Sequence, residues 1–143
     1  MNNEKLVGTK VALINNDKVL AILRDDKPNI DFPGMWDFPG GARDDDETPM
    51  QVATREIKEE LGLELKPEGI LWQKAYPAVA HPGKLAVFVV FHITNEQLAA
   101  VVFGDEGKEW KMMTFDEFLS NGEAVPGMQQ RLHDYLVFAG VLR

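Results

Sequence analysis

Three glutamates, Glu56, Glu59 and Glu60, lie close together in one predicted helix, and their carboxylates could bind a divalent cation. At about 100° per residue the three side chains share one strip of the helix, beside an apolar stripe that must face a core. Like charges at these spacings repel by a few tenths of a kcal/mol per pair. Because Mg²⁺ prefers oxygen ligands and would neutralise the strip, the pattern predicts a metal site; a solvated helix surface is the alternative.

The sequence also predicts where this helix begins and ends. Thr48 is the expected N-cap, Pro49 occupies the first helical position, and Gln51 can complete a capping box. Gly62 stands where a helix end favours a residue with positive φ. These signals predict a helix of about 13 residues, preceded by a tight loop at residues 39–41.

The longer stretch at residues 41–63, GARDDDETPMQVATREIKEELGL, matches every fixed position of the Nudix box. The fixed positions are the glycines at 41 and 62, the glutamate at 47, and the Arg-Glu and Glu-Glu pairs at 55–56 and 59–60. The chain therefore resembles a Nudix hydrolase. The resemblance implies hydrolysis of a nucleoside diphosphate linked to another group, by water activated by Mg²⁺ or Mn²⁺.

The resemblance also implies roles for residues of the box. Glu59 and Glu60 are expected as metal ligands, and Glu56 as a ligand or the general base. Arg55 is expected to form a bidentate pair with Glu47 that fixes the loop against the helix; a simple surface charge is the alternative.

Two further metal ligands are expected around the box. Gly41 is a backbone ligand in many relatives and is expected to need the conformational freedom of glycine, and Gly40 is expected to serve the same turn. A ligand from outside the box is expected at Glu106, with Glu109 as second candidate and a solvated loop as the alternative. The acidic run at residues 44–46 is interpreted as a solvated loop.

The substrate is suggested by residues 24–41, which look like the MutT-like branch of the family. That branch converts nucleoside triphosphates, including oxidised ones such as 8-oxo-dGTP, to a monophosphate and pyrophosphate. Arg24 or Lys27 could contact phosphates. Phe32, Trp36 and Trp72 could stack on a base, with a place in the core as the alternative for each.

Two other functions stay open. An ADP-ribose or other nucleotide-sugar pyrophosphatase is the first alternative, because ADP-ribose hydrolases of the family often carry a proline about fifteen residues after the box. Here that position is Ala78, and Pro77 is one residue short. A catalytically silent nucleotide-sensing module is the second alternative, but such modules usually have degraded glutamates and this box is intact.

The predicted elements give an α+β fold, and the resemblance implies a mixed β-sheet between helices with the box as a loop-helix-loop. A hairpin is predicted from strands at 10–15 and 18–24, whose apolar character suggests burial on both faces. Further strands are predicted at 35–38, 70–76, 85–93 and 109–114, and helices at 114–119 and 128–142. Residues 97–103 fit a strand or a short helix. His92 is interpreted as a core or edge histidine and not as a ligand.

Length, composition and charge indicate how many domains the chain has, where it is located and what it can bind. The 143 residues fit a single domain spanning 1–143 with a substantial core. No apolar run is long enough for a membrane, residues 1–5 show no signal-peptide pattern, and cysteine is absent, which together favour the cytoplasm. The net charge of −8 argues against binding to duplex nucleic acid but leaves a small nucleotide possible if a cation is bound. Either a monomer or a homodimer is compatible with the sequence.

Overall fold

The computed structural model describes residues 5–143, so the expectation about a signal peptide, which rests on residues 1–5, falls almost wholly outside it. The strands are β1 (Leu6–Asn15), β2 (Lys18–Leu23), β3 (Trp36–Asp37), β4 (Gly40–Ala42), β5 (Ile70–Pro77), β6 (Leu85–His92) and β7 (Glu109–Thr114). The helices are α1 (Pro49–Leu61), α2 (Asn95–Ala99), α3 (Phe115–Ser120) and α4 (Pro126–Phe138), with a 3₁₀ turn, η2 (Pro67–Gly69).

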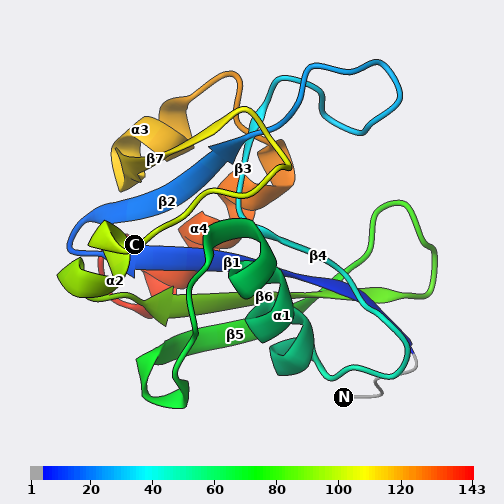
Figure 1. Ribbon diagram of the computed structural model, residues 1–143, viewed down its shortest axis with the longest axis horizontal. Helices are drawn as coiled ribbons and strands as arrows, with labels where there is room; N and C mark the ends of the chain where they lie inside the picture. The colour runs from blue at the N-terminus through cyan, green and yellow to red at the C-terminus, as the bar shows by residue number, and fades with distance from the viewer. Residues whose placement is uncertain (1–4) are drawn as a thin grey trace.

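The strands form one mixed sheet in the order β3-β2-β1-β6-β5, with β4 paired to β1 and β7 paired to β2 (Figure 1). Strands β1 and β6 run parallel, and the other pairs are antiparallel. The hairpin of β1 and β2 pairs only at its turn, through Ile14 with Val19 and Asn15 with Lys18. Further from the turn β1 pairs with β4 instead. Strands β1 and β2 therefore separate beyond their turn, and the sheet opens between them.

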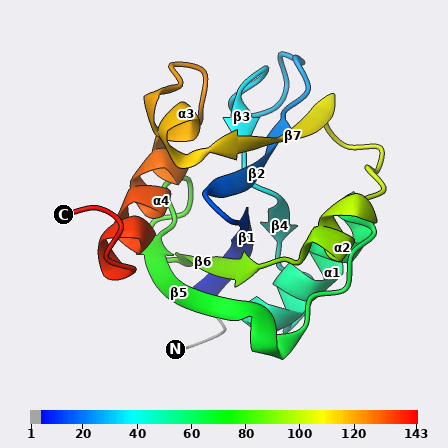
Figure 2. The ribbon, with the colours of Figure 1, turned by 90° about the vertical axis from the view of Figure 1, so that its left-hand side faces the viewer.

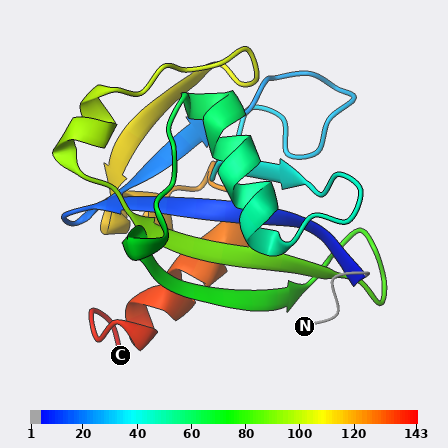
Figure 3. The same ribbon diagram turned by 60° about the horizontal axis from the view of Figure 1, so that its bottom comes forward.

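Helices cover both faces of the sheet. Figure 2 shows α1 and α2 on one side and α3 and α4 on the other, and Figure 3 shows α1 crossing the sheet on the face opposite α4. Strand β1 contributes side chains to an apolar core on each face of the sheet. Val11 and Leu13 pack in the core on the α1 side, whereas Ala12 and Ile14 pack in the core on the α4 side. This arrangement confirms the predicted mixed sheet between helices and the burial of the first strand on both faces.

Several predicted boundaries needed correction. A tight loop was expected at residues 39–41, but residues 40–42 form strand β4, because their backbone pairs with residues 8–10 of β1. Residues 97–103 contain only the end of the short helix α2, and α4 begins and ends earlier than the predicted 128–142. His92 ends β6, which lies between β1 and β5, and it is exposed, so it belongs neither to the core nor to an edge strand. Among residues 5–143, no helix has both the length and the apolar character needed to cross a membrane.

Candidate active site

Helix α1 sets the position of the glutamate strip. Its capping box forms as predicted: the Thr48 hydroxyl accepts from the Gln51 backbone N–H at 3.2 Å, and the Gln51 side chain accepts from the Thr48 N–H at 2.9 Å. Gly62 ends the helix with a φ of 67°, and its N–H donates to the Lys58 carbonyl. Buried Val52, Ala53, Ile57 and Leu61 hold the adjoining face against the sheet, so the glutamates lie at the rim of the α1 core.

Arg55 and Glu47 form the expected bidentate pair. The Arg55 Nε and Nη2 atoms each donate to a Glu47 carboxylate oxygen at 2.9 Å, and Nη2 also donates to the Ala42 carbonyl at 2.9 Å. The Arg55 hydrogen bonds and the Asp44 backbone N–H lower the pKa of Glu47 to about 2. Arg55 therefore connects the loop before α1, the end of β4 and the helix itself.

The three glutamates of the strip differ in surroundings. Burial raises the pKa of Glu60 to about 7, although its carboxylate accepts a 2.8 Å hydrogen bond from the Gly40 N–H. Burial also raises the pKa of Glu56, whose carboxylate accepts from Arg55 Nη1 at 2.9 Å. The Glu59 side chain is 59% exposed and lies 3.4 Å from the same Nη1. Two carboxylates are thus held against the sheet, and the third faces solvent.

Glycine has different consequences at positions 40 and 41. A Cβ on Gly41 would lie 2.6 Å from the Glu56 carboxylate carbon, so a side chain there would displace the Glu56 carboxylate from its present position. Its φ is not positive, which corrects the expectation that Gly41 needs unusual backbone freedom. That need falls on Gly40, whose φ is +129° and whose Cβ would clash with the Thr9 carbonyl oxygen.

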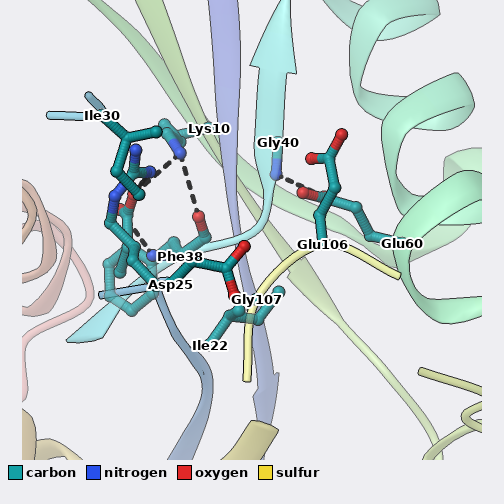
Figure 4. Close-up of a pocket in the computed structure, with 11 residues that line it drawn as sticks. Lys10, Ile22, Asp25, Ile30, Phe38, Gly40, Glu60, Glu106 and Gly107 are labelled. Carbon is teal, nitrogen blue, oxygen red and sulfur yellow. Dashed lines mark hydrogen bonds and ion pairs between the residues drawn. The ribbon is translucent and has the colours of Figure 1, made fainter. Parts of the chain in front are cut away.

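A cleft of about 310 Å³ opens where β1 and β2 separate (Figure 4). Glu60 and Glu106 line one part of it, beside Gly40, and Lys10 and Arg24 line another. The negative charge of Glu106 adds to the raised pKa of both Glu56 and Glu60, after the larger effect of burial. The structure thus brings Glu106, the first candidate from outside the box, to the glutamate strip.

The second candidate, Glu109, starts β7 opposite Leu23 and is not among the residues that line the cleft. The acidic loop at residues 44–46 is exposed, and Asp44 lies 3.5 Å from Arg55 Nε. Neither Glu109 nor the loop at residues 44–46 therefore adds a carboxylate to the lining of the cleft.

Three charged residues that line the cleft were given no role from the sequence: Lys10 of β1, Asp25 of the loop after β2 and Asp37 of β3. Asp37 is 5% exposed, and its Oδ2 lies 2.9 Å from Lys10 Nζ and 3.0 Å from Arg24 Nη1. One signal was available, because Asp37 is a charged residue between Trp36 and Phe38, both buried. A buried charge in such a setting needs a partner.

None of the three aromatic residues that could stack on a base lines the cleft. Trp36 is 9% exposed, belongs to the α4 core and does not line the cleft, so its predicted role in substrate binding is wrong and the core alternative holds. Trp72 packs on Phe88, Tyr135 and Phe138. Phe32 is 48% exposed in the loop after β2 and is also absent from the cleft lining.

The donor chemistry of the strip fits a hard cation. Within residues 5–143, no three acidic, histidine or cysteine side chains converge closely enough to hold a metal ion as placed. However, Glu56 and Glu60 are fixed against β4, and Glu59 and Glu106 are exposed glutamates whose side chains can turn toward them. All candidate donors, including the Gly41 carbonyl, are oxygen atoms, which Mg²⁺ and Mn²⁺ prefer.

Comparison with known proteins shows the family of this chain. The family model described as NUDIX domain matches residues 5–135. The chain belongs to the Nudix family. A crystal structure of a MutT protein from Methanosarcina mazei Go1 superposes with a TM-score of 0.69, covering 94% of this chain and 95% of that one at 20% identity. At that identity the likeness shows the shared fold alone.

Three curated relatives are similar over parts of this Nudix chain. An 8-oxo-dGTP diphosphatase from Haemophilus influenzae is 32% identical over 107 residues, 75% of each chain. A protein of the same name from Proteus vulgaris is 36% identical over 63 residues, 44% of this chain and 56% of its own length. A CTP pyrophosphohydrolase from Escherichia coli is 38% identical over 61 residues, 42% of this chain and 44% of its own. The chain therefore spans only about half the length of the latter two relatives.

Proposed function

We propose that this Nudix protein hydrolyses a deoxynucleoside or nucleoside triphosphate to the monophosphate and pyrophosphate, using Mg²⁺ or Mn²⁺. The observation that carries the proposal is the glutamate strip of α1 at a cleft that also holds two cationic side chains. The names of the relatives, 8-oxo-dGTP diphosphatase and CTP pyrophosphohydrolase, support a triphosphate substrate. Oxidised 8-oxo-dGTP is the first candidate.

Glu59 and Glu60 would hold the cation, with the Gly41 carbonyl and Glu106 as further oxygen donors. When bound, the cation would neutralise phosphate charge and lower the pKa of a bound water. Glu56 either shares the cation or takes the proton from the attacking water; its carboxylate accepts a hydrogen bond from Arg55 and lies beside Gly41. Water adds to a phosphorus as the P–O bond to the pyrophosphate group breaks, and the freed pyrophosphate carries the bonding electron pair.

The Arg55–Glu47 pair has a supporting role in this scheme. Arg55 contacts four acceptors around the strip: Glu47, the Ala42 carbonyl, Glu56 and, at 3.4 Å, Glu59. It thereby fixes the loop, the end of β4 and two of the carboxylates relative to each other. Arg24 is proposed as a phosphate contact from the other part of the cleft.

The experiment is a substrate panel with Mg²⁺, with products separated by chromatography. The panel includes the common dNTPs and NTPs, 8-oxo-dGTP, ADP-ribose, dinucleoside polyphosphates and NADH. We expect one triphosphate to be turned over far above the rest, giving monophosphate and pyrophosphate in equal amounts. Preferential cleavage of ADP-ribose would replace this proposal by the nucleotide-sugar alternative. No turnover of any compound, with Mg²⁺ still bound, would point to a substrate outside the panel before it pointed to a nucleotide-sensing module.

A further inference from the structure

Asp37 uses both carboxylate oxygens inside the protein. Oδ1 accepts a 2.7 Å hydrogen bond from the Phe38 backbone N–H. Oδ2 accepts from Lys10 Nζ at 2.9 Å and from Arg24 Nη1 at 3.0 Å. At the wall of the cleft, the carboxylate therefore has both oxygens engaged within the protein, and its Oδ2 alone holds two positive side chains, Lys10 of β1 and Arg24 just after β2.

Both cations keep donors that the described residues do not use. Lys10 Nζ donates to Asp37 and to the Phe38 carbonyl at 3.2 Å, which leaves one of its three N–H groups free. Arg24 donates through Nε to the Asp31 carbonyl and through Nη1 to Asp37, and its Nη2 has no partner among residues 5–143. Both residues line the cleft that also contains Glu60 and Glu106. Free charged donors at such a cleft suit an anionic group.

We propose that Asp37 is a positioning residue that holds Lys10 and Arg24 together as a paired cationic site for the polyphosphate chain of the substrate. The inference deepens the proposed function and rests on it. Lys10 is thereby added to the substrate-binding residues. The carboxylates of the strip bind the cation, and the Lys10–Arg24 pair binds phosphate oxygens that the cation leaves exposed.

Replacement of Asp37 by asparagine distinguishes a positioning role from a simple charge effect, because the two predict opposite changes in the affinity for an anion. Removing a negative charge from the cleft makes it more positive, so charge alone predicts tighter binding of an anion. Positioning predicts weaker binding. An amide has one oxygen, so Asp37→Asn must turn its NH₂ group either toward the Phe38 N–H or toward Lys10 and Arg24. Donor then faces donor, and the pair separates.

The test is calorimetric titration of inorganic tripolyphosphate into the protein with Mg²⁺, with ³¹P NMR to verify that the probe stays intact. We expect Asp37→Asn and Lys10→Met each to weaken binding about tenfold or more, the usual range for a lost charge-assisted hydrogen bond. Lys18→Met is the matched control, because Lys18 is exposed at the opposite end of β2 and does not line the cleft. It should bind as the wild type does.

The outcomes separate this inference from the proposed function. Unchanged or tighter binding by Asp37→Asn, unchanged binding by Lys10→Met, or no binding by the wild type would overturn the inference. If Asp37→Asn does not fold, the test uses Lys10→Met and Arg24→Gln: weaker tripolyphosphate binding supports the inference, and unchanged binding by either variant overturns it. The expected binding pattern without turnover of any nucleotide would reject the proposed function alone. Nucleotide turnover with unaltered tripolyphosphate binding in the variants would reject the inference alone.

Discussion

The buried carboxylate of Glu60 should make the protein less stable as pH rises, and removing it should reverse that loss. In the folded protein burial raises the pKa of Glu60 from its ordinary 4.5 to about 7. A group with a raised folded-state pKa contributes its full stability below pH 4.5, and that contribution is lost as pH rises through about 7. The loss arises because the ionised carboxylate is better solvated in the unfolded chain.

The magnitude follows from the two pKa values. At about 1.4 kcal/mol per pH unit, the difference between 4.5 and about 7 amounts to about 3 kcal/mol. Glu60→Gln cannot ionise, and its amide oxygen can still accept from the Gly40 N–H, so it should avoid this loss. Without a metal ion at pH 8, Glu60→Gln should therefore be more stable than the wild type by up to about 3 kcal/mol, or about 10 °C in Tm.

The assay is urea unfolding in EDTA at pH 5 and pH 8. The stability gap between Glu60→Gln and the wild type should be large at pH 8 and small at pH 5, and added Mg²⁺ should reduce it by neutralising the wild-type carboxylate. Glu64→Gln is the control, because the Glu64 side chain is 77% exposed and outside the cleft. A variant less stable than the wild type at pH 8, or a gap independent of pH, would refute the reasoning.

Three other predictions concern the same site. Arg55→Ala should lower both activity and Tm, because it leaves the Glu47 carboxylate without its bidentate partner; a loss of kcat with unchanged Tm would show that the pair is not structural. Glu106→Gln should reduce activity at limiting Mg²⁺ more than Glu109→Gln, since only Glu106 lines the cleft; equal rates for both variants and the wild type would remove Glu106 from the site. EDTA should abolish nucleotide hydrolysis and excess Mg²⁺ or Mn²⁺ should restore it; continued turnover in chelator would exclude metal catalysis.

Helix α1 could be predicted from the sequence because its signals are local. The N-cap, the capping box and the C-terminal glycine all act within a few residues of the helix ends. The strip of Glu56, Glu59 and Glu60 follows from helical periodicity alone. The resemblance to the Nudix box added the Arg55–Glu47 pair, whose eight-residue separation carries no periodic signal.

The remaining parts of the cleft depend on contacts between distant segments. Strand β4 has two glycines in its three residues and forms only because β1 pairs with it, so propensity indicated a loop. Lys10 and Asp37 meet across 27 positions of sequence, at the point where β1 separates from β2. Trp36 resembles a base-stacking residue in its motif, but its position in β3 turns it into the α4 core. Such placements follow from sheet topology, which no short window of sequence specifies.

The central claim is that the α1 glutamates form a metal-dependent hydrolytic centre, and Glu59→Gln tests it most directly. Glu59 is exposed, so its replacement should leave the fold and Tm unchanged. The measurement is the rate of pyrophosphate release from the best triphosphate of the panel, with Mg²⁺, for Glu59→Gln and the wild type side by side. We predict a loss of at least about a hundredfold, because mutation of a residue that only supports a metal ligand already costs about 10–100-fold. A wild-type rate in the Glu59→Gln protein would contradict the proposed metal centre.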